Sequence, residues 1–173
     1  MSKKAHDNFR VLYTVASLNK GGGVQSLLKE IIAEADSKNY SFTFISHEKK
    51  DEEGEAFFKN KGCTIYYVTP KKESFIRNYF EIKKIIKSNN FDVVHAHQNF
   101  SNFVPLFIAM MLGVKVRISH VHGNYSSKKI SVKIFHSILR TLNKIVASHW
   151  FACSIESGNW LYGKRWNFRT NCL

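Results

Sequence analysis

The chain has 173 residues, of which 44% are hydrophobic and only two are proline. This length and composition favour one globular domain with a sizeable core and exclude a disordered chain. The formal net charge is +13, from 26 Lys and Arg against 13 Asp and Glu. Because such an imbalance describes association with anions and not the fold, the candidate partners are nucleic acid, an anionic membrane surface and phosphorylated substrates.

Cysteine usage and hydropathy indicate the compartment. The three cysteines are widely spaced (Cys63, Cys153 and Cys172), which predicts no disulfide framework and fits a reducing compartment. The N-terminus, MSKKAHDNFR, has no apolar signal region. The longest apolar window, Phe103–Leu112, is about half the ~20 residues that a membrane span requires. We therefore expect a cytoplasmic protein, and association with the inner face of the plasma membrane stays an open alternative.

The segment RVLYTVASLNKGGGVQSLLKE at Arg10–Glu30 organises the chain. Its β-prone run, Val11–Ala16, predicts a strand, and apolar residues at helical spacing over Val24–Ala35 predict a helix. Between them stand three glycines: Gly21, Gly22 and Gly23. A strand, glycine turn and helix start direct free backbone N–H groups and a positive helix end toward an anion.

Strands and helices alternate through the rest of the chain. The predicted strands are Ser41–Ser46, Cys63–Val68, Phe91–Ala96, Val114–Ser119 and Trp150–Ser154. The predicted helices are a short one within His47–Lys61, then Ser74–Ser88, Asn99–Leu112, a long one capped by Ser126 or Ser127 and running to about Ala147, and Glu156–Tyr162. Six strands alternating with helices predict an α/β fold with a doubly wound parallel sheet.

In such a sheet, ligands bind outside the carboxyl ends of the strands. The glycine loop lies at that edge, but it lacks the spacing of a dinucleotide fingerprint and the Lys-Ser/Thr ending of a P-loop. A plain tight turn and a phosphate-binding turn are therefore both open interpretations.

Two His-x-His pairs also fall at predicted strand ends: His95 with His97, and His120 with His122. Residues i and i+2 of a strand share a face, so each pair could converge. A metal site is one interpretation, but no Asp or Glu occurs from Val93 to Ile155, and we expect no metal. A histidine that meets a substrate hydroxyl or phosphate is a second interpretation. Ordinary strand-end histidines bonded to loops are the third, and we favour it for His95.

Basic residues cluster in two stretches of the chain, and the second stretch, within Val93–Ile155, contains no acid to offset them. They are Lys71, Lys72, Arg77, Lys83, Lys84 and Lys87 on the first, and Lys115, Arg117, Lys128, Lys129, Lys133, Arg140 and Lys144 on the second. A solvated helix face and a surface for anionic lipid headgroups are both open. We expect no nucleic-acid partner, because the aromatic residues are not interleaved with basic ones on one sheet and no recognition motif occurs.

In this order, four segments resemble the amino-terminal domain of family 4 glycosyltransferases of the GT-B fold. They are LNKGGGVQSLLKE, FDVVHAH, RISHVHGN and FACSIESGNWLYG. The resemblance covers about residues 9–163 and is closest to enzymes of capsular and exopolysaccharide synthesis. It implies a Rossmann-like, amino-terminal half of a GT-B fold over residues 1–163, with an atypical tail at 164–173.

The resemblance implies a retaining enzyme that moves a sugar from a nucleotide-sugar to a lipid-linked saccharide acceptor, without a cofactor. Gly21, Gly22 and Gly23 match the loop that approaches the donor phosphates and the acceptor, with Gln25 where the family often has an acid. His122 matches the active-site histidine, and His120 is the alternative register. The residues matched to the acceptor side are His97, Asn124 and Ser154.

The same resemblance implies a second domain with most of the nucleotide contacts. We therefore expect a truncated or split enzyme, inactive alone, whose partner is a separate carboxyl-terminal domain. Two other classes stay open: a non-catalytic module that docks on a membrane or partner protein, and a histidine-metal hydrolase.

Overall fold

The computed structural model describes residues 8–36, 38–48, 51–124, 128–164 and 166. Six parallel strands form one sheet in the order β3-β2-β1-β4-β5-β6. The strands are β1 (Phe9–Val15), β2 (Tyr40–Ser46), β3 (Thr64–Tyr67), β4 (Val93–Ala96), β5 (Val116–Val121) and β6 (His149–Ala152). The predicted α/β class with a doubly wound parallel sheet is confirmed.

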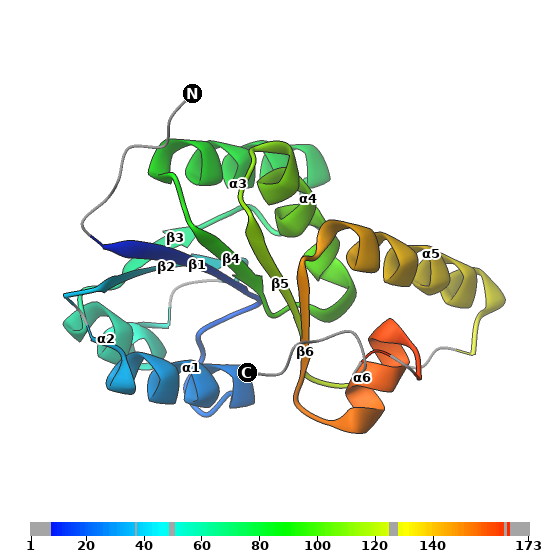
Figure 1. The fold of residues 1–173 in the computed structure, drawn as a ribbon, viewed down its shortest axis with the longest axis horizontal. Coiled ribbons are helices and arrows are strands. Elements are labelled where there is room, and N and C mark those ends of the chain that lie inside the picture. The colour runs from blue at the N-terminus through cyan, green and yellow to red at the C-terminus, as the bar shows by residue number, and fades with distance from the viewer. Residues whose placement is uncertain (1–7, 37, 49–50, 125–127, 165, 167–173) are drawn as a thin grey trace.

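Helices cover both faces of the sheet (Figure 1). One face carries α1 (Gly23–Glu34) and α2 (Glu52–Asn60), and the other carries α3 (Phe75–Asn89), α4 (Phe103–Met111) and α5 (Ile130–Val146). A last helix, α6 (Ile155–Tyr162), follows β6. Because every crossover passes through a helix, all strands point the same way and their carboxyl ends meet at one edge.

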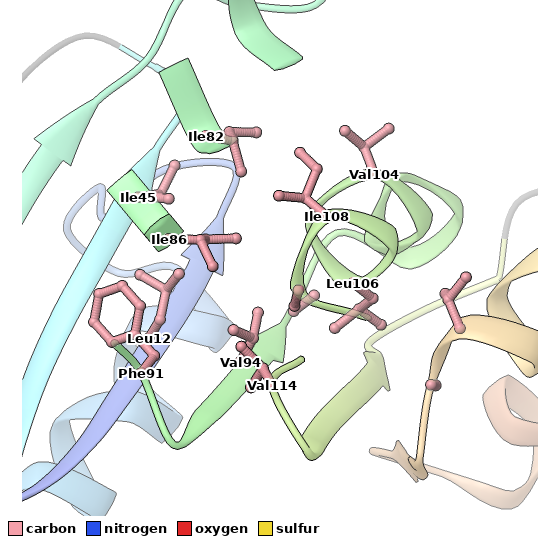
Figure 2. Packing of buried hydrophobic residues seen from close by; sticks show 14 of the residues in the cluster. Leu12, Ile45, Ile82, Ile86, Phe91, Val94, Val104, Leu106, Ile108 and Val114 are labelled. Carbon is pink, nitrogen blue, oxygen red and sulfur yellow. The ribbon is translucent and has the colours of Figure 1, made fainter. Parts of the chain in front are cut away.

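Each face of the sheet has its own apolar core. Leu12, Val94 and Ile86 belong to the core beneath α3 and α4 (Figure 2), and Leu28 and Phe58 belong to the core beneath α1 and α2. The strands contribute to both cores because they are buried on both faces, as expected for a parallel sheet. A third, smaller cluster joins α6 to the end of β5.

Two helix starts differ from the sequence prediction. The segment predicted as one helix from Asn99 begins as a 3₁₀ turn, Asn99–Asn102, and α4 starts only at Phe103. Pro105 explains this start, because proline is tolerated in the first turn of a helix and not further along. The predicted caps Ser126 and Ser127 lie outside the described residues, and α5 begins after Lys129, which makes no side-chain cap.

The apolar face of α5 is largely uncovered. Ile130, Ile134, Phe135, Ile138 and Ile145 are all more than half exposed, and the buried residues of this helix are Asn143 and Val146. Residues spaced by four share a face of a helix, so Ile130, Ile134 and Ile138 form a continuous exposed strip. Among the described residues, no helix combines the length and hydrophobicity of a membrane span.

Candidate functional site at the carboxyl edge of the sheet

The glycine turn joins β1 to α1. Gly21 has φ +80°, a left-handed conformation that glycine adopts without a steric penalty. Gly22 occupies the N-cap position, and no side chain caps the helix. The first turn of α1 therefore presents backbone N–H groups that lack intrahelical partners.

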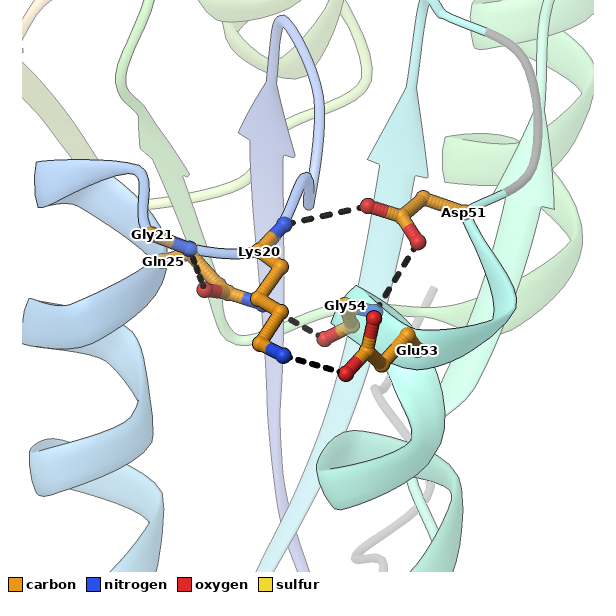
Figure 3. Close-up of polar contacts among 6 residues, drawn as sticks. All are labelled: Lys20, Gly21, Gln25, Asp51, Glu53 and Gly54. Carbon is orange, nitrogen blue, oxygen red and sulfur yellow. Dashed lines mark hydrogen bonds and ion pairs between the residues drawn. The ribbon is translucent and has the colours of Figure 1, made fainter.

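The side chain of Gln25 hydrogen-bonds to this turn and to α2 (Figure 3). Its side-chain oxygen accepts a hydrogen bond from the Gly21 N–H at 3.2 Å, and its side-chain nitrogen donates to the carbonyls of Leu18 at 3.1 Å and Gly54 at 2.6 Å. The residue is 2% exposed. The role of Gln25, which the sequence left open, is thus structural: it joins the turn to the start of α2.

The neighbouring Lys20 is also tied to α2. Its backbone N–H donates to the Asp51 carboxylate at 3.0 Å, and its ammonium pairs with Glu53 (Figure 3). The N–H groups of Gly21 and Gly22 are already used within the turn. An anion at this site would therefore meet the N–H groups of Gly23 and the residues after it, rather than those of all three glycines.

The four histidines of the two His-x-His pairs meet in one cluster. His95 Nε2 lies 3.3 Å from His120 Nδ1, and His97 Nδ1 lies 2.7 Å from His122 Nε2. Within each pair the rings are also in contact: the centroids of His95 and His97 are 4.1 Å apart with tilted rings, and those of His120 and His122 are 4.2 Å apart with stacked rings. The predicted convergence of each pair is confirmed, and the two pairs also join each other.

The expectation that His95 bonds to a loop is wrong. It is 6% exposed, and its ring nitrogen is paired with the ring of His120 on the adjacent strand. Parallel pairing of β4 with β5 sets His95 opposite Ile118, which lies two residues before His120. The two His-x-His pairs are therefore offset by two residues along the strands.

Burial keeps the cluster neutral. It lowers the pKa of His95 and His97 well below the usual value, with neighbouring imidazoles as the second cause. Burial also lowers the pKa of His120 to about 3 and lowers that of His122, the least buried of the four. At neutral pH these rings therefore act as neutral donors and acceptors rather than as cations.

Three of these histidines could also hold a metal ion. Ligand atoms of His95, His97 and His120 lie within 4.8 Å of one another, and neutral imidazole is a common ligand. The causes that perturb the four histidines are burial and other imidazoles, with no carboxylate among them. The cluster thus offers nitrogen ligands without the carboxylate that commonly orients a ligating histidine.

Polar side chains on the 3₁₀ turn position the second pair. Asn99 accepts a hydrogen bond from the His122 N–H at 3.0 Å, and Asn102 donates to the His120 carbonyl at 3.1 Å. Sequence reasoning missed both, because it assigned them to an apolar helix. The polar start of QNFSN, directly after a strand-end histidine, was the available signal.

Of the remaining predicted acceptor-side residues, Asn124 is exposed just beyond β5. Ser154 is the N-cap of α6, where its hydroxyl accepts from the Ser157 N–H at 3.1 Å in a capping box. This cap accounts structurally for a serine at that position. Two of the three cysteines are described, and both are free thiols: Cys63 is buried and Cys153 is exposed. Cys172 lies outside the described residues.

A six-stranded parallel sheet with a glycine turn and polar residues at its carboxyl edge is a Rossmann-like architecture, which fits the amino-terminal half of a GT-B fold. The chain matches the crystal structure of MurG from Acinetobacter baumannii with a TM-score of 0.59 and 14% identity, over 86% of this chain and 42% of that one. At this identity the match shows the fold.

The sequence profile of Glycosyltransferase Family 4 matches residues 21–161, and the chain belongs to that family. It is 26% identical over 162 residues to EpsF of Bacillus subtilis (strain 168), which carries a glycosyltransferase name. It is 25% identical over 137 residues to the capsular polysaccharide biosynthesis glycosyltransferase CapH of Staphylococcus aureus. These matches cover 90% and 79% of this chain but only 41% and 36% of the relatives.

Proposed function

We propose that this chain is the acceptor-side domain of a retaining glycosyltransferase of surface polysaccharide synthesis. The observation that carries the proposal is the presence of His122 and an uncapped helix start at one edge of the sheet of a family 4 domain. The donor is a nucleotide-sugar, and the acceptor is a lipid-linked saccharide. Most donor contacts come from a second domain, on the same polypeptide or on a separate chain.

The proposed chemistry assigns the two features different roles. As the glycosidic bond breaks, negative charge develops on the leaving diphosphate, and the N–H groups at the start of α1 stabilise it. His122, neutral and the least buried of the four, hydrogen-bonds the donor sugar and positions it. His120 and His97 hold its ring in place through stacking and the 2.7 Å contact.

The proposed site for membrane association is α5. Its exposed strip (Ile130, Ile134 and Ile138) lies on a helix that also carries the basic residues Lys133, Arg140 and Lys144. Apolar side chains beside cations suit the boundary of an anionic bilayer. This association would bring the domain to a lipid-linked acceptor at the inner face of the plasma membrane.

A transfer assay with labelled nucleotide-sugar and lipid-linked acceptor, with and without EDTA, tests the proposal. The expected result is transfer by the complete enzyme that is unchanged by EDTA. Metal-dependent hydrolysis in place of transfer would support the hydrolase, which the three close histidines allow. Vesicle binding by the complete protein without any transfer would support the docking module.

A further inference from the structure

A cavity of about 760 Å³ opens at the carboxyl edge beside the histidine cluster. Its walls come from the segments that follow β1, β2, β3 and β4, and His97 belongs to both the cavity and the cluster. A volume of this size is typical of small-ligand sites. The three glycines are not part of its lining.

Lys71, directly after Pro70, is a largely buried cation in this wall. Its ammonium donates to the side-chain oxygen of Gln98 at 3.3 Å and to the carbonyl of Ser101 at 3.2 Å. Both acceptors are neutral, and within the described part of the chain no carboxylate is paired with it. Loss of solvent lowers the pKa of Lys71 to about 8, which leaves the group charged at neutral pH.

An ammonium group has three N–H donors, so Lys71 retains one after these two bonds. A buried charge without a counter-ion is costly, and such groups are normally paired. The two carboxylates in the lining, Glu48 and Glu73, are exposed, and the Asn19 amide donates to Glu48 at 3.2 Å. The charge on Lys71 is thus left for a ligand.

His47 provides a second donor in the same wall. The Asn78 side-chain amide donates to the Thr69 carbonyl at 2.7 Å, which fixes its NH₂ group, and the same group lies 3.1 Å from His47 Nδ1. Nδ1 must therefore accept, and the ring hydrogen lies on Nε2. That nitrogen is buried and has no hydrogen-bond partner within the described residues. Burial, with a smaller contribution from Lys71, lowers the pKa of His47 to about 4, so the ring is neutral.

The third group is His97, which is 5% exposed. Its Nδ1 contacts His122, and its buried Nε2 has no partner among the described residues. Buried polar atoms almost always have a hydrogen-bond partner, because a buried donor or acceptor without one destabilises the fold. His47, His97 and Lys71 therefore line a single cavity. Each of the two imidazoles has a buried nitrogen without a hydrogen-bond partner, and the ammonium has no counter-ion, among the described residues.

We propose that this cavity binds an oxyanion carried by the acceptor, a phosphate or a carboxylate, with Lys71 and His47 as its donors. Oxyanions accept several hydrogen bonds at once and supply the counter-ion that Lys71 lacks. The assignment to the acceptor rests on the proposed function, since the donor diphosphate is placed at α1. The contact through His97 would couple occupancy of the cavity to the position of His122.

Direct titration of the 173-residue chain tests the proposal. Methyl phosphate represents a lipid-linked phosphate, and glucuronate represents an acidic sugar; binding is followed by calorimetry and by the NMR signals of the His47 ring. We expect saturable binding that Lys71→Met weakens about tenfold or more, as loss of a charge-assisted bond implies. Tighter binding of methyl phosphate assigns the oxyanion to phosphate, and tighter binding of glucuronate assigns it to a carboxylate.

Two variants and one unfolding measurement serve as controls. Lys71→Arg keeps the charge and should bind within a few-fold of the wild type, Lys84→Met removes an exposed lysine of α3 and should change nothing, and urea unfolding confirms that Lys71→Met folds. The proposal is overturned if neither anion binds, or if Lys71→Met binds like the wild type. A nucleoside diphosphate whose binding depends on Lys71 would also overturn it, by assigning the cavity to the donor. Because no transfer is needed, anion binding without transfer in the complete enzyme contradicts only the proposed function.

Discussion

Gln25 holds the glycine turn with three hydrogen bonds, two of them donated by its side-chain nitrogen. A glutamate of the same shape would set a carboxylate oxygen against the carbonyls of Leu18 and Gly54. We predict that Gln25→Glu destabilises the domain by about 1–3 kcal/mol, the cost of buried polar groups left unpaired. Urea unfolding measures this effect.

Glu30→Gln, an exposed change of equal size on the same helix, is the matched control and should shift the unfolding midpoint little. Equal stability of Gln25→Glu and the wild type would show that this residue does not brace the turn.

The histidine cluster predicts a pH dependence of stability. The pKa of each of its four histidines is lower in the folded state than the unfolded value of about 6.5. Protons therefore bind the unfolded chain first, so stability is full above about pH 6.5 and is lost as the pH falls toward the folded-state values. Each fully buried ring adds up to about 1.4 kcal/mol per pH unit within that window.

Urea unfolding at about pH 7.5, 6.5 and 5.5 measures this slope. His95→Gln removes one ring of the cluster and should reduce it, whereas His149→Gln alters an exposed histidine on β6 and should not. A free energy of unfolding that stays constant between the two lower pH values would contradict burial of the neutral cluster.

At the scale of elements, α5 shows what periodicity can and cannot predict. The apolar positions of this helix could be assigned from the sequence, because spacing identifies the residues that share a face. Spacing does not indicate whether another element covers that face. The apolar Ile134 and Phe135 are 57% and 58% exposed, whereas the polar Asn143 of the same helix is fully buried.

We predict that Phe135→Ser weakens binding of the chain to vesicles containing anionic phosphatidylglycerol. Loss of one inserted aromatic side chain corresponds to about 1.5–3 kcal/mol, or roughly ten- to a hundredfold in the partition coefficient. Ile31→Ser, an exposed apolar residue of α1 on the opposite face of the sheet (Figure 1), is the matched control. Vesicle flotation measures both.

Equal binding of Phe135→Ser and the wild type, or binding that is insensitive to the anionic lipid, would exclude α5 as the membrane contact. In either case its apolar strip would be assigned to a protein partner.

At the scale of the whole molecule, alternation of strand and helix patterns was sufficient to predict the parallel sheet. The joining of the two His-x-His pairs was not predictable, because it depends on β4 lying beside β5 in a register that sets His95 opposite Ile118. The cavity at Lys71 was missed for a similar reason. Its donors come from loops after β2, β3 and β4, and a lysine among many others shows no sign of burial in the sequence.

The most direct test of the proposed reaction centre is the turnover of His122→Ala in the complete enzyme. Turnover should fall on the order of 10²-fold or more, the size expected for loss of a group that hydrogen-bonds the reacting substrate. His149→Ala, an exposed histidine outside the cluster, should retain activity. Turnover of His122→Ala near that of the wild type would contradict the account, and a loss confined to His120→Ala would move the reaction centre to His120.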